Sequence, residues 1–319
     1  MRNLASTLSN QGKWKEAEEF QVAEIAIIRR VLGAEHPRTY ASMANLALIF
    51  KGQGRLQEAE DLEMQVAEIS RTVLGKEHPE ILTSMANLAS IYLDQGRVNE
   101  AELLQTEVIE TRKKVLGPDH ASTLTSIANL ASIYSKQGRF FEAEALEVEA
   151  METRKQQLGP EHPLTLSSMA NLSLTCYYQG RWKEAEALGK EILGKKQMVL
   201  GPEHPSTLTT MNNLASIFSI QGKLGKAEKL EAEVLEMRKR VLGEEHPDTV
   251  ASMNQLAITL NDQSRFEEAK ALMITVIQLL KRLHGPSHPY TTASQSSLDE
   301  WEAVTRAQRG LGAKKGSIQ

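Results

Sequence analysis

The chain repeats itself every 42 residues, and this period restricts its possible folds more than any other feature of the sequence. A histidine recurs at that interval: His36, His78, His120, His162, His204, His246 and His288. A glycine precedes each histidine by three residues, and no insertion or deletion interrupts the spacing. Periods of roughly 20 to 50 residues are typical of proteins that stack one small structural unit. We therefore expect each 42-residue segment to fold as one such unit.

Segment 79–120 predicts what that unit is. Pro79 suits the first position of a helix, where no amide donor is needed. An apolar stripe follows at the i, i+3, i+4 and i+7 spacing of one helical face: Met85, Leu88, Ala89 and Tyr92. Gln95–Gly96 then ends the helix, because glycine adopts the left-handed cap conformation without strain.

A second helix is predicted to start near Val98 and to end at Gly117–Pro118. Its inward-facing residues are expected to be Ala101, Leu104, Val108 and Val115. Neither helix of the hairpin can bury its apolar stripe alone, so the hairpins must stack on one another. The sequence therefore predicts an all-α protein, an α-solenoid of about seven helical hairpins.

Four short motifs resemble the tetratricopeptide repeats of kinesin light chains and nephrocystin-like proteins. They are Asn-Leu-Ala-x-x-Tyr from Asn87, Gln-Gly-Arg from Gln95, Glu-Ala-Glu from Glu100 and Leu-Gly-x-Glu-His-Pro from Leu74. The resemblance extends from Met1 to about Arg309. It implies a right-handed superhelix whose first helices line a concave groove. It also implies a non-catalytic scaffold that binds a peptide segment of another protein in that groove.

The period assigns the hairpins to seven segments: 1–36, 37–78, 79–120, 121–162, 163–204, 205–246 and 247–288. A capping helix is predicted over 290–308, where Leu298 and Trp301 can cover the last apolar face. The solenoid is then expected to span residues 1–309. Residues 310–319 have no periodicity and are expected to be disordered.

Composition and charge exclude several classes of partner. The formal net charge of -4 argues against nucleic acid, which needs a basic surface to neutralise its phosphates. Cys176 is the only cysteine, so no internal disulfide can form, and residues 1–16 show no secretory pattern. No segment is apolar over the roughly 20 residues needed to span a bilayer. We expect a cytoplasmic monomer with protein or peptide partners and without nucleic-acid or membrane partners.

The recurring histidines suggest a metal or catalytic site, which packing geometry opposes. Neighbouring helices pack roughly 8–10 Å apart, whereas zinc ligands lie about 2 Å from one ion. We expect each ring to hydrogen-bond the backbone where the chain enters a helix. Residues 222–226 contain glycine and lysine without the spacing of a phosphate-binding loop. The sequence therefore predicts no enzyme and no catalytic, cofactor or metal site.

An asparagine recurs on the first helix of successive hairpins, on the side away from the apolar stripe. Asn87 points about 150° from the centre of that stripe, at about 100° per residue. In the implied fold this side faces the groove, where an amide can donate to and accept from a peptide backbone. The predicted groove residues are Asn45, Asn87, Asn129, Asn171, Asn213, Asn212, Asn254, Ser90 and Ser132. The alternative is that these amides bridge neighbouring first helices or hold water.

The fifth hairpin departs most from the pattern. Tyr177 and Tyr178 fall on or beside the groove side, and we expect them to anchor an apolar side chain of a bound peptide. Places around the asparagines, such as Thr83 and Ala86, hold small uncharged residues. Apart from Arg2, the groove is predicted to lack basic residues, so a client held by its C-terminal carboxylate is not expected.

Three functions follow from this pattern. The first is a scaffold or adaptor that binds a peptide segment of a partner. The second is the sensing arm of a larger nucleotide-dependent signalling protein. The third is a structural module that assembles end to end.

Overall fold

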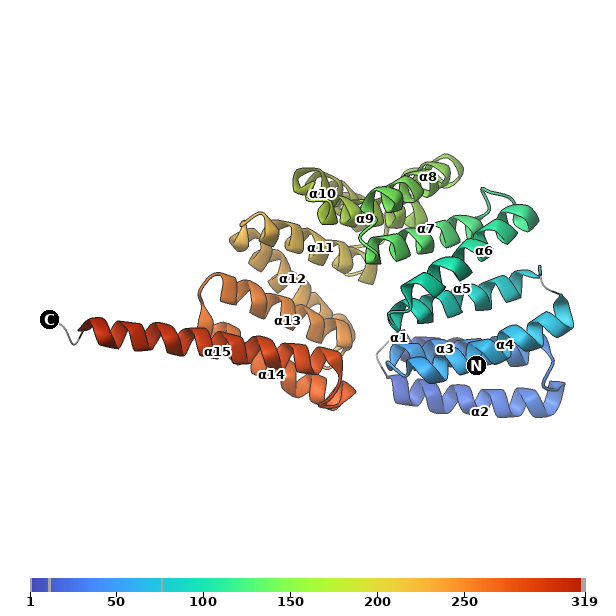
Figure 1. The fold of residues 1–319 in the computed structure, drawn as a ribbon, viewed down its shortest axis with the longest axis horizontal. Coiled ribbons are helices and arrows are strands. Elements are labelled where there is room, and N and C mark those ends of the chain that lie inside the picture. The colour runs from blue at the N-terminus through green and yellow to red at the C-terminus, as the bar shows by residue number, and fades with distance from the viewer. Residues whose placement is uncertain (1, 11–12, 76, 317–319) are drawn as a thin grey trace. The chain divides into compact units, whose positions relative to one another are not determined.

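The structure is a computed structural model that describes residues 2–10, 13–75 and 77–316 (Figure 1). The regular structure of these residues is entirely α-helical, in fifteen helices. The helices are α1 (Arg2–Asn10), α2 (Trp14–Leu32), α3 (Pro37–Gly52), α4 (Leu56–Leu74), α5 (Pro79–Asp94), α6 (Val98–Leu116), α7 (Ala121–Lys136), α8 (Phe140–Leu158), α9 (Pro163–Tyr178), α10 (Trp182–Val199), α11 (Pro205–Ile220), α12 (Leu224–Leu242), α13 (Pro247–Asp262), α14 (Phe266–His284) and α15 (Pro289–Gly316). The odd-numbered helices are called A helices and the even-numbered ones B helices. The predicted all-α fold of consecutive hairpins is confirmed.

A histidine caps each A helix from α3 to α15. At the start of α9, Nδ1 of His162 accepts the N–H of Leu164 at 3.2 Å, and Pro163 follows as the first helical residue. The same bond is made by His36, His78, His120, His204, His246 and His288. His120 makes it although Ala121 replaces the proline. The expected role of the rings, hydrogen-bonding local backbone, is confirmed.

The glycine before each histidine ends the preceding B helix, except at α10, where Leu200 is the C-cap. Gly159 has φ +92°, a conformation that L side chains rarely adopt, and its N–H donates to the carbonyl of Lys155. The hydroxyl of Thr165 in α9 donates to the Gly159 carbonyl at 2.9 Å. The end of one hairpin is thus bonded to the start of the next.

Replacing His162 by alanine removes the acceptor at the start of α9. The free energy of unfolding should fall by about 1 kcal/mol, the usual contribution of a helix N-cap. His162→Asn is the matched control, because its side-chain oxygen can accept the same bond. Urea unfolding followed by circular dichroism compares the two variants. Equal stability of His162→Ala and the wild type would show that the cap contributes nothing.

Two compact units make up the chain, residues 1–180 and residues 181–319, called unit 1 and unit 2. Within each unit the helices pack on their neighbours in sequence, so a B helix lies between its own A helix and the next. In unit 1, α6 contacts α5 through Val108 and Leu82. It contacts α7 through Ile109 and Leu124.

The buried side of the B helices differs from the prediction. The buried residues of α6 are Ala101, Gln105, Val108, Ile109 and Arg112. The predicted Val115 is instead 41% exposed. The reason is that α6 packs against two A helices, so its buried side is rotated toward α7. There Gln105 Nε2 donates to the Ser126 carbonyl at 3.0 Å.

The Gln-Gly-Arg motif joins consecutive repeats at the turn between A and B helices. After α5, Gln95 Nε2 and Arg97 Nη1 donate to the two oxygens of Glu60 in α4, at 2.8 and 2.7 Å. The Arg97 guanidinium also lies over the Tyr92 ring, 3.9 Å from its centroid. The equivalent links are Glu18 with Gln53 and Arg55, Glu102 with Gln137 and Arg139, and, in unit 2, Glu228 with Gln263 and Arg265. The motif, written Gln-Ser-Arg at 263–265, therefore connects each of these repeats to the one before it.

The last helix, α15, differs from the other A helices on the side that would receive a B helix. Three positions that are apolar in α13 (Val250, Met253 and Ala257) are polar in α15 (Thr292, Gln295 and Asp299), and Glu302, in the place of Leu260, pairs with Lys270 of α14. Leu298 and Trp301 pack against the core of α13 and α14, the contact predicted for a capping helix. Because its outer side is polar, α15 needs no further helix to cover it. It continues to Gly316, past the predicted end at 308 and into the predicted tail (Figure 1).

Candidate functional site

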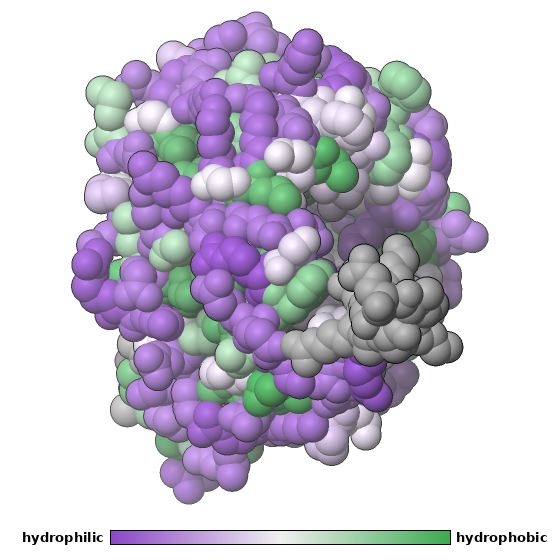
Figure 2. Space-filling view, turned by 90° about the vertical axis from the view of Figure 1, so that its left-hand side faces the viewer, coloured by the Kyte–Doolittle hydropathy of each residue, from purple (hydrophilic) through white to green (hydrophobic). Residues whose placement is uncertain are grey.

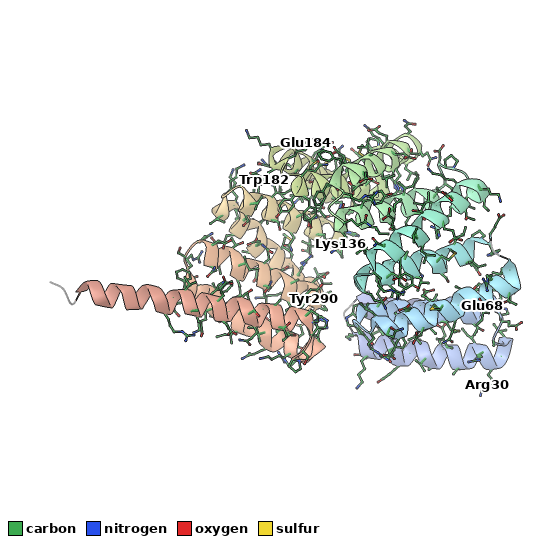
Figure 3. All side chains as sticks on the ribbon, in the orientation of Figure 1. Arg30, Glu68, Lys136, Trp182, Glu184 and Tyr290 are labelled. Atoms are coloured by element: carbon green, nitrogen blue, oxygen red, sulfur yellow. The ribbon has the colours of Figure 1, made fainter. Side chains whose placement is uncertain are left out.

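The A helices of unit 1 leave one side uncovered, called here the A face. Its residues are Ala41, Asn45 and Leu48 of α3; Thr83, Asn87 and Ser90 of α5; Thr125, Asn129 and Ser132 of α7; and Ser167, Asn171 and Leu174 of α9. All are exposed or half-buried. Lys136, at the end of α7, lies on the opposite side of unit 1 from Arg30 and Glu68 of the B helices (Figure 3). The A face is therefore a surface distinct from that of the B helices.

The helical angle of Asn87 predicted that its side chain faces outward, but in the structure the side chain is partly turned inward. It is half-buried, and its Nδ2 donates at 2.8 Å to Oε1 of Glu63, a fully buried carboxyl in α4. The amide thus bridges to the preceding B helix rather than to a neighbouring A helix. Ala86, expected beside it on the exposed side, is buried. Asn129 is exposed, while Asn45 and Asn171 are half-buried.

The predicted row of asparagines is divided between the two units. Asn212, Asn213 and Asn254 belong to unit 2, where all three are half-buried. Asn254 Oδ1 accepts the hydroxyl of Ser294 in α15 at 3.3 Å.

The serines and tyrosines of the predicted site lie in unit 1. Ser90 Oγ accepts from Lys51 Nζ at 2.6 Å, and Ser132 donates to the carbonyl of Ala128. Tyr178 is 51% exposed, and its ring stacks on Phe140 with centroids 5.6 Å apart. Tyr177 meets Tyr178 edge-on, so the two tyrosines and Phe140 form one partly exposed aromatic cluster at the end of α9.

Two buried cations lie beneath the A face, and neither forms an ion pair among the described residues. Arg112, 5% exposed, donates through Nη1 to Ser126 Oγ in α7 at 2.7 Å. Its Nη2 donates to the exposed Thr83 of α5 at 3.2 Å. Arg154 repeats this arrangement one hairpin later, with Ser168 and Thr125. Burial lowers the pKa of both guanidinium groups.

Sequence reasoning missed these cations because it considered only the A helices. They come from the B helices and reach the A face from below. The available signal was the 42-residue recurrence of a basic residue among buried positions: Arg112, Arg154, Lys196 and Arg238. In unit 2, Lys196 and Arg238 bond to Thr210 and Ser252 in the same way.

Buried carboxyls occupy one place in three B helices, seven residues before Ser70, Arg154 and Arg238. Burial raises the pKa of Glu63 and Glu147 in unit 1, and of Glu231 in unit 2, to about 7. Glu147 takes a hydrogen bond from Thr175, while its Oε2 has no partner among the described residues. Nearby Glu144 raises its pKa further. A neutral carboxyl is favoured here because a charge would be desolvated and unpaired.

Stability should fall as pH rises from about 4.5 to about 7. In this window folded Glu147 keeps a proton that the unfolded chain has released, so raising the pH favours unfolding. Glu147→Gln should raise the free energy of unfolding at pH 8 and flatten its dependence on pH. Glutamine already occupies this place in Gln21 and Gln105. Urea unfolding at several values from pH 4 to 8 measures the effect, and Glu149→Gln on the exposed side is the control. If Glu147→Gln leaves the slope of unfolding free energy against pH unchanged, the prediction is refuted.

The repeats of this chain match models of a known protein family. Residues 1–72, 80–156 and 119–197 match one tetratricopeptide repeat model, and residues 207–248 and 249–290 match another. The chain belongs to the tetratricopeptide repeat family. Proteins built from these repeats are generally non-catalytic scaffolds that bind protein partners. A search of curated proteins found no match.

Solved structures place the repeats among those of kinesin light chain type. A putative kinesin light chain with nearly identical TPR-like repeats from Podospora anserina is 31% identical, with a TM-score of 0.53; the match covers 64% of this chain and 97% of that one. BtubC (BKLC) from P. vanneervenii is 20% identical over 72% of this chain and 92% of its own, with a TM-score of 0.57. A Rap protein in complex with competence and sporulation factor is 12% identical over 96% and 98%, with a TM-score of 0.55. The last two show the fold alone.

Other kinds of site find no support in the described residues. No group of three or more His, Cys, Asp or Glu side chains there could hold a metal ion. None of the helices described is both long and apolar enough to cross a membrane. The surface drawn in Figure 2 is mostly hydrophilic, with hydrophobic residues scattered over it.

Proposed function

We propose that this tetratricopeptide repeat protein is a scaffold whose A face binds an extended segment of a partner protein without catalysis. The observation that carries the proposal is the pair of uncompensated cations, Arg112 and Arg154, beneath an otherwise small and uncharged row of exposed side chains. Burying a cation without an anion is costly. A surface that keeps two of them favours a ligand that supplies carboxylates.

The geometry of the row sets the length of that segment. Four A helices, α3 to α9, contribute to the A face, and packed helices lie roughly 8–10 Å apart. At about 3.3 Å per residue, an extended peptide of about eight residues would reach across them. Exposed amides such as Asn129 can pair with its backbone. Tyr178 and Leu174 offer an apolar contact at the α9 end.

The cations favour acidic side chains in the middle of the segment. Arg112 and Arg154 bond only to neutral oxygens among the described residues, so their field is not cancelled locally. Thr83 and Thr125, which touch them, are both exposed. A carboxylate that lies over either threonine would therefore approach a guanidinium.

A cytoplasmic location fits this role, because a chain whose single cysteine is the buried Cys176 has no internal disulfide. Assembly end to end loses support at α15, whose outer side is polar.

Selection from a random peptide library on the purified protein tests the proposal. We expect enriched peptides to carry acidic residues, and enrichment to be lost with Asn129→Glu, which adds a negative charge in the middle of the A face. Arg112→Leu with Arg154→Leu should remove the acidic preference; leucine already occupies this place as the buried Leu280. A folded wild-type protein that enriches no peptide would refute the proposal.

The matched control is Lys113→Leu with Lys155→Leu. These lysines adjoin the two arginines in sequence, are exposed, and pair with Glu149 and Glu152 on the B helices. The control changes net charge by the same amount, so a loss of acidic preference there would assign the effect to overall charge rather than to the A face.

A further inference from the structure

A cavity of about 260 Å³ opens at the start of the A face, between α1, α2 and α3. Its apolar walls are Ala5, Trp14, Leu48 and Ile49. Trp14 is held close to Gly52 of α3, where even an added Cβ would meet the indole ring at 2.4 Å. The indole ring therefore packs directly against the Gly52 backbone, where a residue with a side chain would clash with it.

In the next repeat, a polar bridge spans the corresponding place. The place of Ser9 is taken there by Lys51, whose Nζ lies 2.6 Å from Ser90 Oγ and 3.2 Å from Asp94. Ser90 in turn occupies the place of Leu48. This polar bridge crosses from α3 to α5. Ser9 is too short to make it, and Leu48 offers no acceptor.

A second contact between neighbouring helices also differs between the two repeats. Glu63 of α4 accepts the amide of Asn87 in the next A helix. Gln21, the residue at the same place in α2, instead donates to Glu24 of its own helix at 2.9 Å. Asn45, the counterpart of Asn87, remains half-buried at the rim of the cavity. The contact that joins α3 to α5 is thus missing between α1 and α3, and the contact that joins α4 to α5 is replaced between α2 and α3.

The residues that line the cavity determine which kind of chemical group it can bind. Among the side chains that the structure describes, no charged one lines the cavity, and Leu48, 45% exposed, stands at its opening. Trp14 Nε1 and Ser9 Oγ in the walls have no hydrogen-bond partner among the described residues. A charged group entering here would exchange its hydration for these neutral polar groups without meeting an opposite charge, which does not offset the cost of desolvation. The volume is below the roughly 300–1,000 Å³ typical of small-molecule sites and suits one side chain.

We propose that this cavity receives one large apolar side chain, of leucine or phenylalanine size, from the segment bound on the A face. The inference rests on the proposed function, since the same segment supplies the side chain. Asn45 at the rim lies in the asparagine row of the A face, so the segment backbone passes beside the opening. The cavity then fixes the register of the segment relative to Arg112 and Arg154.

The variant Ser9→Lys with Leu48→Ser tests this directly, because it recreates the Lys51–Ser90 bridge of the next repeat. In the peptide selection, we expect the preference for a large apolar residue at one position to disappear while the acidic preference remains. Binding of a selected peptide should weaken roughly tenfold, the value of one apolar side chain lost from a pocket. Leu48→Phe, which fills the opening, is a second variant with the same expected result.

A probe that needs no bound segment separates this inference from the proposed function. Titration with N-acetyl-leucinamide, followed by the indole N–H resonances of Trp14, Trp182 and Trp301, should shift Trp14 in the wild type and not in Ser9→Lys/Leu48→Ser. N-acetyl-aspartamide, which carries a carboxylate, should not shift it. Equal shifts at all three tryptophans, or retained shifts in the variant with unchanged circular dichroism, would overturn the cavity assignment. A Trp14 shift without any peptide enrichment would retain the cavity and reject the proposed function.

Discussion

The structure depends on the burial of each B helix between two A helices. Val108 in α6 and Val234 in α12 are completely buried, although an isolated hairpin would leave one side of its B helix in water. Within each unit, stacking removes that side from water and leaves one side of the A helices uncovered. The A face is therefore a by-product of the packing that stabilises the solenoid.

Buried polar side chains of the B helices contribute both to the packing of the repeats and to the surface where a partner would bind. The B helices bury Gln105 and Arg112 where apolar residues would stabilise the fold more simply. Their hydrogen bonds to α7 hold the next A helix in register, because each donor has an acceptor at one place along it. Arg112 also reaches the exposed Thr83, so a residue that joins two repeats carries positive charge to the surface where a partner would bind.

Where the repeats differ in sequence, the surface presents different kinds of side chain. The same helical position holds Lys51 in one repeat, Tyr177 in another and Ser219 in unit 2. Lys51 bridges to the next A helix, while Tyr177 joins an aromatic cluster with Tyr178. Because the backbone repeats, such substitutions alter only the side chains offered to a partner. A single fold can in this way present a cavity, a polar row and an aromatic cluster in succession.

The sequence by itself determined the hairpins, their boundaries and their caps. His162, Pro163 and Gly159 act within a few residues of their own position, so their pattern could be interpreted without knowing the neighbours. Only the tertiary structure decided that Arg112 is buried, that Val115 is exposed and that Asn87 bonds to Glu63. Each of these depends on a helix of an adjacent repeat, and the periodicity of one helix does not show which of its sides that neighbour covers.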